Sequence, residues 1–244
     1  MGKLNQWAIG VQRFYHNNVD DNLKHLCIKI LLGKHAQQTK YGIRAAVEQK
    51  MTQNEQSYTT FTPIRVGMVT WNLAGQTPYQ HFDIANILLQ DPHSGELKTP
   101  EILVVAFQEM VKLNVTSIMK GKDLNAIQMW TDVVLKALNK SPYPYVCVSK
   151  KAMVGQLMLF FVKDSHKHAI NSIKTTRVET ALGGNTGNKG AVIIRFNYND
   201  SSFLLFNCHL SSGQEQNMQR LEDITQIYQR AFDSAKGYQE YNTQ

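Results

Sequence analysis

Residues 183–190 read Gly183-Gly184-Asn185-Thr186-Gly187-Asn188-Lys189-Gly190, and they lead into two apolar strand patterns at residues 191–196 and 202–210. Four glycines in eight positions allow the backbone to adopt positive φ angles and to approach a ligand closely. Asn188 and Lys189 add an amide and a compact positive charge. The stretch therefore predicts a turn that binds an anion such as a phosphate.

The two strands after this turn are almost continuously apolar. Such a pattern is typical of strands that are buried on both faces between layers of secondary structure. Lys189 precedes the first strand and His209 ends the second. We therefore expect both residues at the ends of core strands, where functional sites are often built.

The rest of the chain alternates strand and helix patterns. Strand patterns occur at residues 64–71, 102–107, 145–149, 156–162 and 170–180, and helical patterns at residues 81–90, 123–138 and 214–232. The early strands alternate with helices, and strands outnumber helices. The predicted fold class is α/β, a layered β-sandwich flanked by helices.

The first 62 residues differ from the layered part. Residues 1–33 carry apolar residues at helical spacing, which predicts a helical tail. Residues 34–62 are polar and rich in glutamine, which predicts a linker with a short helix at residues 43–50. The layered domain is expected at residues 63–244.

Composition narrows the class of protein. The sequence contains no apolar run of about 20 residues, the length that crosses a membrane as a helix, and no secretory pattern at its start. We expect a cytoplasmic protein. Cys27, Cys147 and Cys208 lie in apolar runs without metal-ligand spacing, which predicts reduced, buried thiols. The net charge of +7 favours an anionic partner: a nucleic acid, an acidic membrane or a polyphosphate.

Two oxygen-bearing residues follow buried strands directly. Asn72 comes after the strand at residues 64–71, and Glu109 comes just beyond the strand at residues 102–107. One amide and one carboxylate suit Mg²⁺, which keeps most of its waters and accepts substrate phosphate as a ligand. Each residue alone also fits a structural role, Asn72 in a turn and Glu109 in solvent. In the same way, His209 alone fits a core histidine and Lys189 a surface lysine.

The order of these motifs carries a resemblance. Thr70-Trp71-Asn72, Phe107-Gln108-Glu109, Gly187-Asn188-Lys189-Gly190 and Asn207-Cys208-His209-Leu210 together resemble the inositol polyphosphate 5-phosphatase family, of the endonuclease/exonuclease/phosphatase fold type. The likeness spans residues 64–232. Residues 13–33 resemble the end of a Sac-type phosphatase domain, without that domain's Cys-x5-Arg loop, and this arrangement is typical of synaptojanin-like proteins.

The resemblance implies roles for five residues. Asn72 and Glu109 would hold Mg²⁺, and Asn188 and Lys189 would contact a substrate phosphate. His209 would hydrogen-bond the phosphoryl oxygens, and His209, Glu109 and Asn72 would be the catalytic set. The implied reaction is magnesium-dependent hydrolysis of the 5-phosphate of phosphatidylinositol 4,5-bisphosphate or of a soluble inositol phosphate. The partners would be that phosphoinositide lipid or inositol phosphate and an acidic membrane surface, with peripheral membrane association and no nucleic acid; the oligomeric state is left open.

The sequence departs from this family after His209. The family's later Trp-x-Gly-Asp-x-Asn, Trp/Tyr-x-Asp-Arg and Ser-Asp-His segments do not occur among the 35 residues that follow. We therefore expect a fold truncated at its C-terminal side and little activity from these 244 residues alone. Two alternatives stay open: a non-catalytic lipid-binding fragment and a magnesium-dependent nuclease of the same fold.

Overall fold

The structure, a computed structural model, describes residues 4–5, 40–91, 93–97, 99–111, 122–180, 188–232 and 239–241. The chain divides into two compact units, one made of Met1–Phe14 with Ile64–Gln244 and the other of Tyr15–Pro63. The sequence predicts the start of the layered domain at residue 63, and the larger unit resumes at Ile64.

The smaller unit contains helices α2 (Lys40–Gln53) and α3 (Glu55–Tyr58). The predicted linker at residues 34–62 thus contains more helix than the expected turn or two at residues 43–50. Lysine, glutamine, glutamate and alanine, which have high helix propensity, account for the longer helix despite its weak apolar pattern. In the predicted helical tail, Leu4–Asn5 instead form strand β1, and the rest of residues 1–33 lie outside the described residues.

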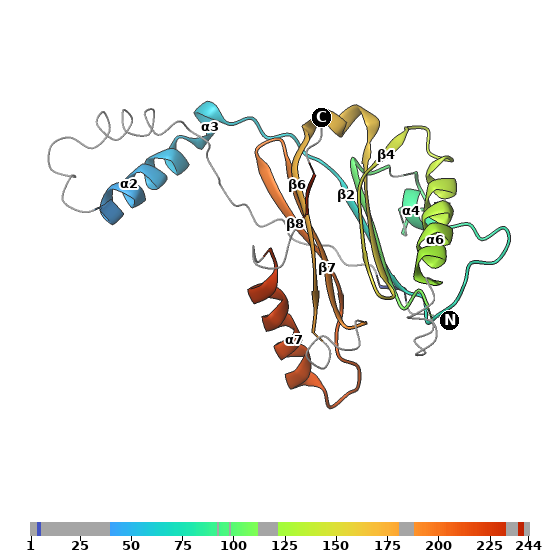
Figure 1. Cartoon of the computed structure of the whole chain (residues 1–244). Helices are drawn as coiled ribbons and strands as arrows, with labels where there is room; N and C mark the ends of the chain where they lie inside the picture. The colour runs from blue at the N-terminus through green and yellow to red at the C-terminus, as the bar shows by residue number, and fades with distance from the viewer. Residues whose placement is uncertain are drawn as a thin grey trace. The chain divides into compact units, whose positions relative to one another are not determined.

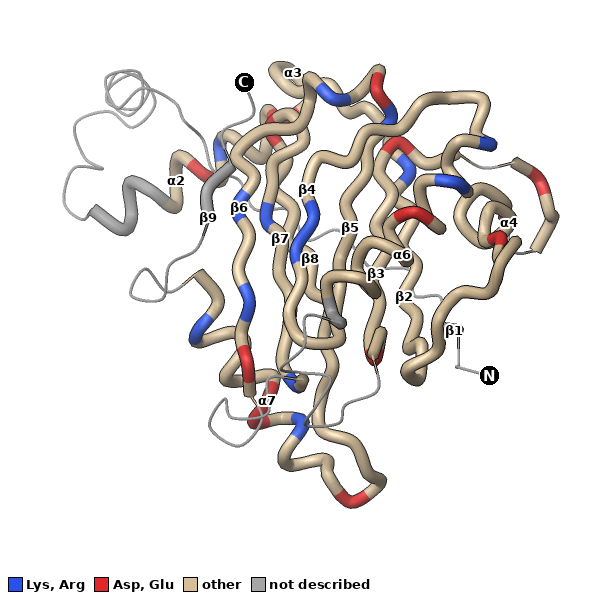
Figure 2. Tube along the Cα trace, turned by 45° about the vertical axis from the view of Figure 1, so that its right-hand side comes forward, with Lys and Arg blue, Asp and Glu red and all other residues tan. Residues whose placement is uncertain are grey.

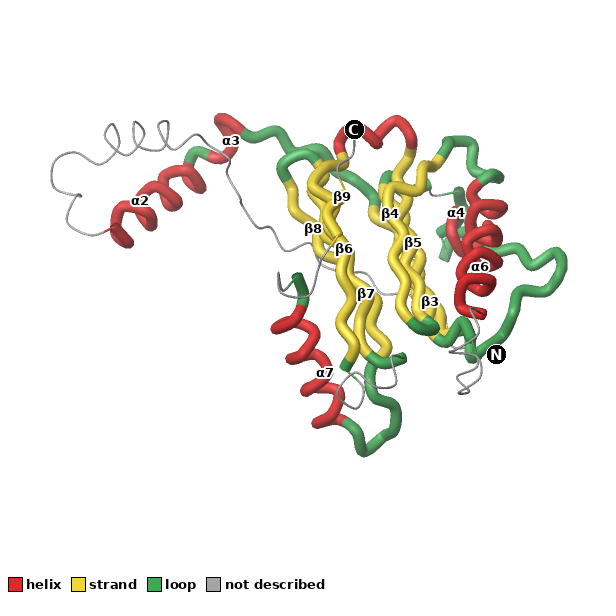
Figure 3. The backbone as a smooth tube through the Cα atoms, viewed as in Figure 1, coloured by secondary structure: helices red, strands yellow, loops and turns green. Residues whose placement is uncertain are grey.

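Among the described residues of the larger unit, strands form two sheets (Figures 1 and 3). The first sheet has the order β1-β2-β3-β5-β4, from β2 (Val66–Asn72), β3 (Ile102–Gln108), β4 (Tyr145–Met153) and β5 (Gln156–Lys163). The second has the order β8-β7-β6-β9, from β6 (Ile170–Glu179), β7 (Gly190–Tyr198), β8 (Ser201–His209) and β9 (Gln239–Tyr241). A 3₁₀ helix, η2 (Asp164–Ala169), connects β5 to β6.

The two sheets pack face to face, and helices cover their outer faces (Figure 1). Helices α4 (Ala85–Leu89) and α6 (Lys122–Leu138) cover the first sheet, where Trp130 packs against Phe107. Helix α7 (Asn217–Arg230) covers the second sheet through Ile227. Between the sheets, Phe160 of β5 packs on Phe196 of β7. This layering explains the continuous apolar strands, because every residue of β3 and of β5 is buried.

Strand directions bring separate polar residues to one end of the sandwich. Strands β2 and β3 are parallel and in register from Val66↔Ile102 to Asn72↔Gln108, so both end at the same edge. In the second sheet Gly190 pairs with His209, which places the start of β7 beside the end of β8. In the part of the chain that the structure describes, no helix is long and apolar enough to cross a membrane.

Two sequence predictions need correction. The helix expected at residues 81–90 is shorter, because the Asp83 side chain accepts a hydrogen bond from the Ala85 N–H (3.0 Å) in a turn that starts α4 only at Ala85. Cys147 and Cys208 are free thiols, as expected, but they are exposed rather than buried. They lie on β4 and β8, the end strands of the two sheets within the described residues. Cys27 lies outside those residues.

Candidate active site

Glu109 projects from the end of β3 through an unusual backbone turn. Its φ angle is +50°, in the left-handed region that residues other than glycine seldom adopt. Neighbouring backbone groups hold this conformation: the Gly75 N–H donates to the Glu109 carbonyl (2.7 Å), and the Met110 N–H donates to the Gly155 carbonyl (3.1 Å). The strand therefore ends abruptly, and the carboxylate stays accessible, with 37% of the side chain exposed.

His209 ends β8 and contacts three groups of the site. Its Nδ1 lies 2.9 Å from the Asn188 carbonyl oxygen, and its Nε2 lies 2.9 Å from Lys189 Nζ and 3.2 Å from Glu109 Oε1. A carbonyl only accepts, so Nδ1 carries the proton, and in the neutral ring Nε2 accepts from the Lys189 ammonium. Burial and the positive charge of Lys189 lower the pKa of His209, against the opposing effects of the Asn188 carbonyl and Glu109. The ring is therefore neutral near pH 7.

Lys189 lies at the turn before β7. Burial lowers the pKa of its ammonium group, and the negative charges of Glu109 and Asp223 act in the opposite direction. The Lys189 carbonyl accepts a hydrogen bond from the Thr180 N–H (3.0 Å), which holds this end of the turn against β6. With the backbone of Lys189 fixed, its half-buried ammonium group is suited to contact an anion.

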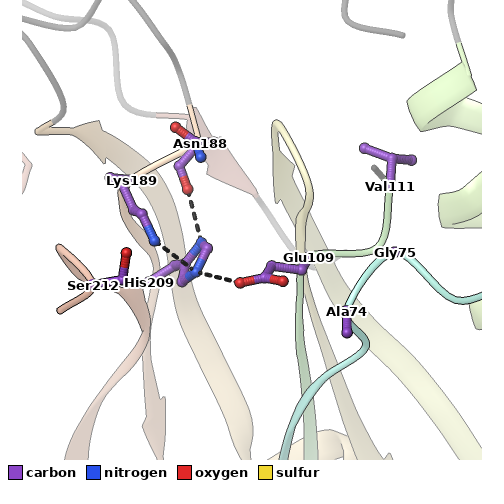
Figure 4. A pocket seen from close by; sticks show the side chains of 8 residues that line it. All are labelled: Ala74, Gly75, Glu109, Val111, Asn188, Lys189, His209 and Ser212. Carbon is purple, nitrogen blue, oxygen red and sulfur yellow. Dashed lines mark hydrogen bonds and ion pairs between the residues drawn. The ribbon is translucent and has the colours of Figure 1, made fainter. Parts of the chain in front are cut away.

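These side chains line one cavity between the ends of the two sheets (Figure 4). Its volume is about 380 Å³, and its lining residues are Ala74, Gly75, Glu109, Val111, Asn188, Lys189, His209 and Ser212. Glu109 comes from the first sheet and faces His209 and Lys189 from the second (Figure 4). The structure thus brings together Glu109, Asn188, Lys189 and His209, which the sequence selects as site residues.

Asn72 lies at the margin of the cavity rather than in its lining. Its side-chain Oδ1 accepts a hydrogen bond from the Ala74 N–H (2.9 Å), and Ala74 and Gly75 of that turn line the cavity. The amide therefore shapes the wall directly. The glycine-rich turn at residues 183–190 is described only from Asn188 onward.

A polar bridge that was not predicted from the sequence joins the two sheets. Asn207, only 2% exposed, donates from Nδ2 to the carbonyls of Phe107 and Leu157 (3.1 Å each). Its Oδ1 accepts from Gln108 Nε2 (2.6 Å), which also donates to Thr70 Oγ1 (3.0 Å). Asn207 belongs to the second sheet and these partners to the first. The sign of this bridge in the sequence is an asparagine within an otherwise apolar stretch of β8.

The donor set fits a hard cation with few protein ligands. The structure shows no group of three or more histidine, cysteine or acidic side chains that could hold a metal, within the residues it describes. Glu109 offers an accessible carboxylate at the cavity, and Asn72 Oδ1 retains a second lone pair beyond its turn hydrogen bond. One carboxylate with one amide matches Mg²⁺, which keeps several waters.

Comparison with known proteins identifies the class. The family model described as "Endonuclease/Exonuclease/phosphatase family 2" matches residues 69–242. The chain belongs to the endonuclease/exonuclease/phosphatase family, and the predicted fold type is confirmed.

Within this family the relatives are synaptojanins and inositol polyphosphate 5-phosphatases, which confirms the resemblance found in the sequence. Human synaptojanin-2 is 30% identical over 255 residues, covering 94% of this chain and 17% of synaptojanin-2. Polyphosphatidylinositol phosphatase INP53 of Saccharomyces cerevisiae is 30% identical over 230 residues, covering 93% of this chain and 20% of INP53. The chain therefore spans about a fifth of these relatives' length.

A solved structure agrees with the sequence relatives. The inositol polyphosphate 5-phosphatase domain of SPsynaptojanin, in complex with inositol (1,4)-bisphosphate and calcium ion, superposes with a TM-score of 0.59 at 26% identity. The match covers 75% of this chain and 51% of that domain.

Proposed function

We propose that this chain carries part of a magnesium-dependent inositol polyphosphate 5-phosphatase site that acts on phosphatidylinositol 4,5-bisphosphate or a soluble inositol phosphate. The observation that supports this most is the meeting of Glu109 from one sheet with Lys189 and His209 from the other in one cavity. A carboxylate opposite a cationic and an imidazole group is suited to a phosphate ester bound beside a metal ion.

Each site residue has a separate role in the proposed reaction. Glu109, with Asn72, would hold the cation, which when bound neutralises charge on the phosphoryl oxygens. Lys189 binds a phosphate oxygen through its ammonium group, and the Asn188 side chain adds an amide contact. The Asn188 carbonyl fixes the His209 ring, so that Nε2 faces the cavity, where it accepts from water in the neutral ring and donates to a phosphoryl oxygen once it is protonated.

Membrane association is a second part of the proposal. The net charge of +7 supports attraction to an acidic membrane surface, where a phosphoinositide headgroup would be presented at the cytoplasmic side. We propose a cytoplasmic protein that associates peripherally with such membranes.

Metal binding tests the site without requiring turnover. Calorimetric titration of the 244-residue protein with Mg²⁺ and with Ca²⁺ should show binding that Glu109→Gln removes, because this variant loses the anionic oxygen. Glu222→Gln, an exposed glutamate on α7, is the matched control and should bind like wild type. Equal Mg²⁺ affinity in wild type and Glu109→Gln would overturn the metal assignment.

Phosphate release tests the reaction. Vesicles that contain phosphatidylinositol 4,5-bisphosphate, and soluble inositol 1,4,5-trisphosphate, are incubated with the protein and Mg²⁺. We propose little release by the 244-residue chain, since residues 210–244 contain no segment like the family's aspartate-bearing motifs. Even slow release supports the phosphatase if Glu109→Gln abolishes it. Vesicle binding with no release at all supports the lipid-binding alternative, and cleavage of DNA supports the nuclease.

A further inference from the structure

The turn between β8 and α7 forms one wall of the cavity and is fastened to the helix. The connection spans residues 210–216, and Ser212 lines the cavity three residues after His209, which ends β8. Asp223 Oδ2 accepts a hydrogen bond from the Ser211 N–H (2.9 Å). Arg220 Nη1 donates to the carbonyls of Ser211 (3.2 Å) and Gly213 (2.7 Å). Two side chains on one face of α7 thus hold the backbone of Ser211 at both its polar groups.

Asp223 is unusual because it is buried while only one of its two carboxylate oxygens accepts a hydrogen bond within the described residues. It is 1% exposed, and its Oδ1 has no hydrogen-bond partner among the described residues. A buried ionised carboxylate is costly unless a positive charge lies nearby, and an asparagine could accept from the Ser211 N–H without that cost. A charged carboxylate at this position requires a positive group nearby.

Lys189 is the positive group that meets this requirement. Its half-buried ammonium is affected by the charge of Asp223 from α7 and of Glu109 from β3, and it contacts the His209 ring at the end of β8. Arg220 is occupied elsewhere, because its guanidinium group bonds to the two turn carbonyls and to the Asn217 side chain.

We propose that Asp223 is a positioning residue of the site, which holds the wall at residues 211–213 through one carboxylate oxygen and whose negative charge acts on Lys189. The inference deepens the proposed function, because it rests on Lys189 and Ser212 belonging to a phosphate-binding cavity. The negative charge of Asp223 then continues to favour the cationic form of Lys189 when Glu109 is engaged by a metal ion. Asp223 acts through Lys189 and the turn and does not touch the substrate.

The charge is tested by titrating Lys189 in solution. The side-chain ¹³Cε signal of Lys189, assigned with Lys189→Arg, is followed against pH in wild type, Asp223→Asn and the matched control Glu222→Gln. Asn keeps an acceptor for the Ser211 N–H and removes the charge. We expect the Lys189 midpoint to move to lower pH in Asp223→Asn and to stay unchanged in Glu222→Gln. If Lys189 titrates identically in Asp223→Asn and Glu222→Gln, the charge role is wrong.

The wall is tested by amide hydrogen exchange at Ser211. The wild-type amide should be protected, Asp223→Ala should lose about tenfold or more of that protection, and Asp223→Asn should retain most of it. If the wild-type Ser211 amide exchanges at the rate of an open turn, Asp223 does not hold the wall. This result would overturn the proposal even if Asp223→Ala does not fold. Neither measurement uses metal, substrate or turnover, so these outcomes are separate from a failure of the phosphatase proposal.

Discussion

Asn207 is a polar residue in an apolar sandwich, and it joins the two halves of the site. Its amide spans from β8 to the carbonyls of Phe107 and Leu157 and to the Gln108 side chain. Gln108 precedes Glu109, and Asn207 lies on the same face of β8 as His209. The bridge therefore sets how closely the carboxylate and the imidazole approach.

Asn207→Leu, which is similar in size, should lower the free energy of unfolding by about 2 kcal/mol or more, because it leaves buried polar groups without their partner. It should also weaken Mg²⁺ binding by loosening the approach of the two sheets. Urea denaturation and calorimetry measure the two effects. Asn197→Leu, whose amide contacts stay within the second sheet, is the control and should leave Mg²⁺ binding intact. Unchanged stability and Mg²⁺ binding in Asn207→Leu would contradict the bridging role.

His209 should make stability depend on pH. Its pKa is lowered in the folded state, chiefly by burial and by Lys189, whereas an unfolded histidine titrates near about 6.5. Below that pH the unfolded chain binds a proton that the folded chain does not, so the free energy of unfolding falls as the pH drops from about 6.5 toward the folded pKa.

Urea denaturation of wild type and His209→Asn at pH values above and below this range, in metal-free buffer, measures the effect. The difference between the two proteins isolates His209 from the other histidines. The loss of stability on acidification should be smaller in His209→Asn, and an equal loss in both proteins would contradict the prediction.

At the scale of elements, the start of β7 depends on a glycine. Gly190 has a φ angle of +135°, and a Cβ atom there would lie 1.9 Å from the Val178 carbonyl oxygen on β6. Gly190→Ala should therefore lower the free energy of unfolding by about 4 kcal/mol or more. Gly95→Ala is the control, since Gly95 also has a positive φ (+69°) but open space around it, and should cost about 1–2 kcal/mol of backbone strain. Equal losses in thermal or urea denaturation would contradict the steric argument.

The elements that could be predicted from sequence are those whose environment is uniform. The sequence predicts β3, β5 and β7 to within one or two residues, because strands buried on both faces are apolar along most of their length. The helix predicted at residues 81–90 is longer than α4, since a local hydrogen bond of the Asp83 side chain sets where α4 starts. The helix predicted at residues 43–50 is shorter than α2, because the apolar pattern of α2 is weak although its residues have high helix propensity.

The site could be predicted only in part for a related reason. Glu109, Lys189 and His209 each mark a strand boundary, which the apolar pattern reveals. Asn207 and Asp223 act through contacts with segments distant in sequence, or through burial, and neither leaves a pattern in its neighbours. Their roles require the packing of the two sheets and α7.

At the scale of the whole molecule, basic residues gather on neighbouring strands. Figure 2 shows Lys and Arg along β4 and β6, among them the exposed Lys150 and Arg177. The positive charge of Arg177, together with burial as the larger effect, lowers the pKa of Lys151 on β4, so charges from the two sheets lie close together.

Binding to vesicles that contain phosphatidylserine should therefore weaken steeply as salt rises from roughly 0.05 to 0.5 M, because salt screens exposed charges. Lys150→Glu should bind such vesicles more weakly than wild type, and neutral phosphatidylcholine vesicles serve as the control. Vesicle sedimentation measures the bound fraction. Salt-independent binding would exclude an electrostatic attraction to acidic membranes.

The bridge from Asn207 to Phe107 also bears on how the chain reaches its fold. It joins residues 100 positions apart, and Glu109 and His209 meet across the same separation. Closing a loop of that length has an entropic cost that only the completed interface between the sheets can offset. Each sheet's hairpins, such as β4–β5 and β7–β8, can form from neighbouring segments first. The cavity is then among the last parts of the molecule to assemble during folding, and among the first to open when the sheets begin to separate.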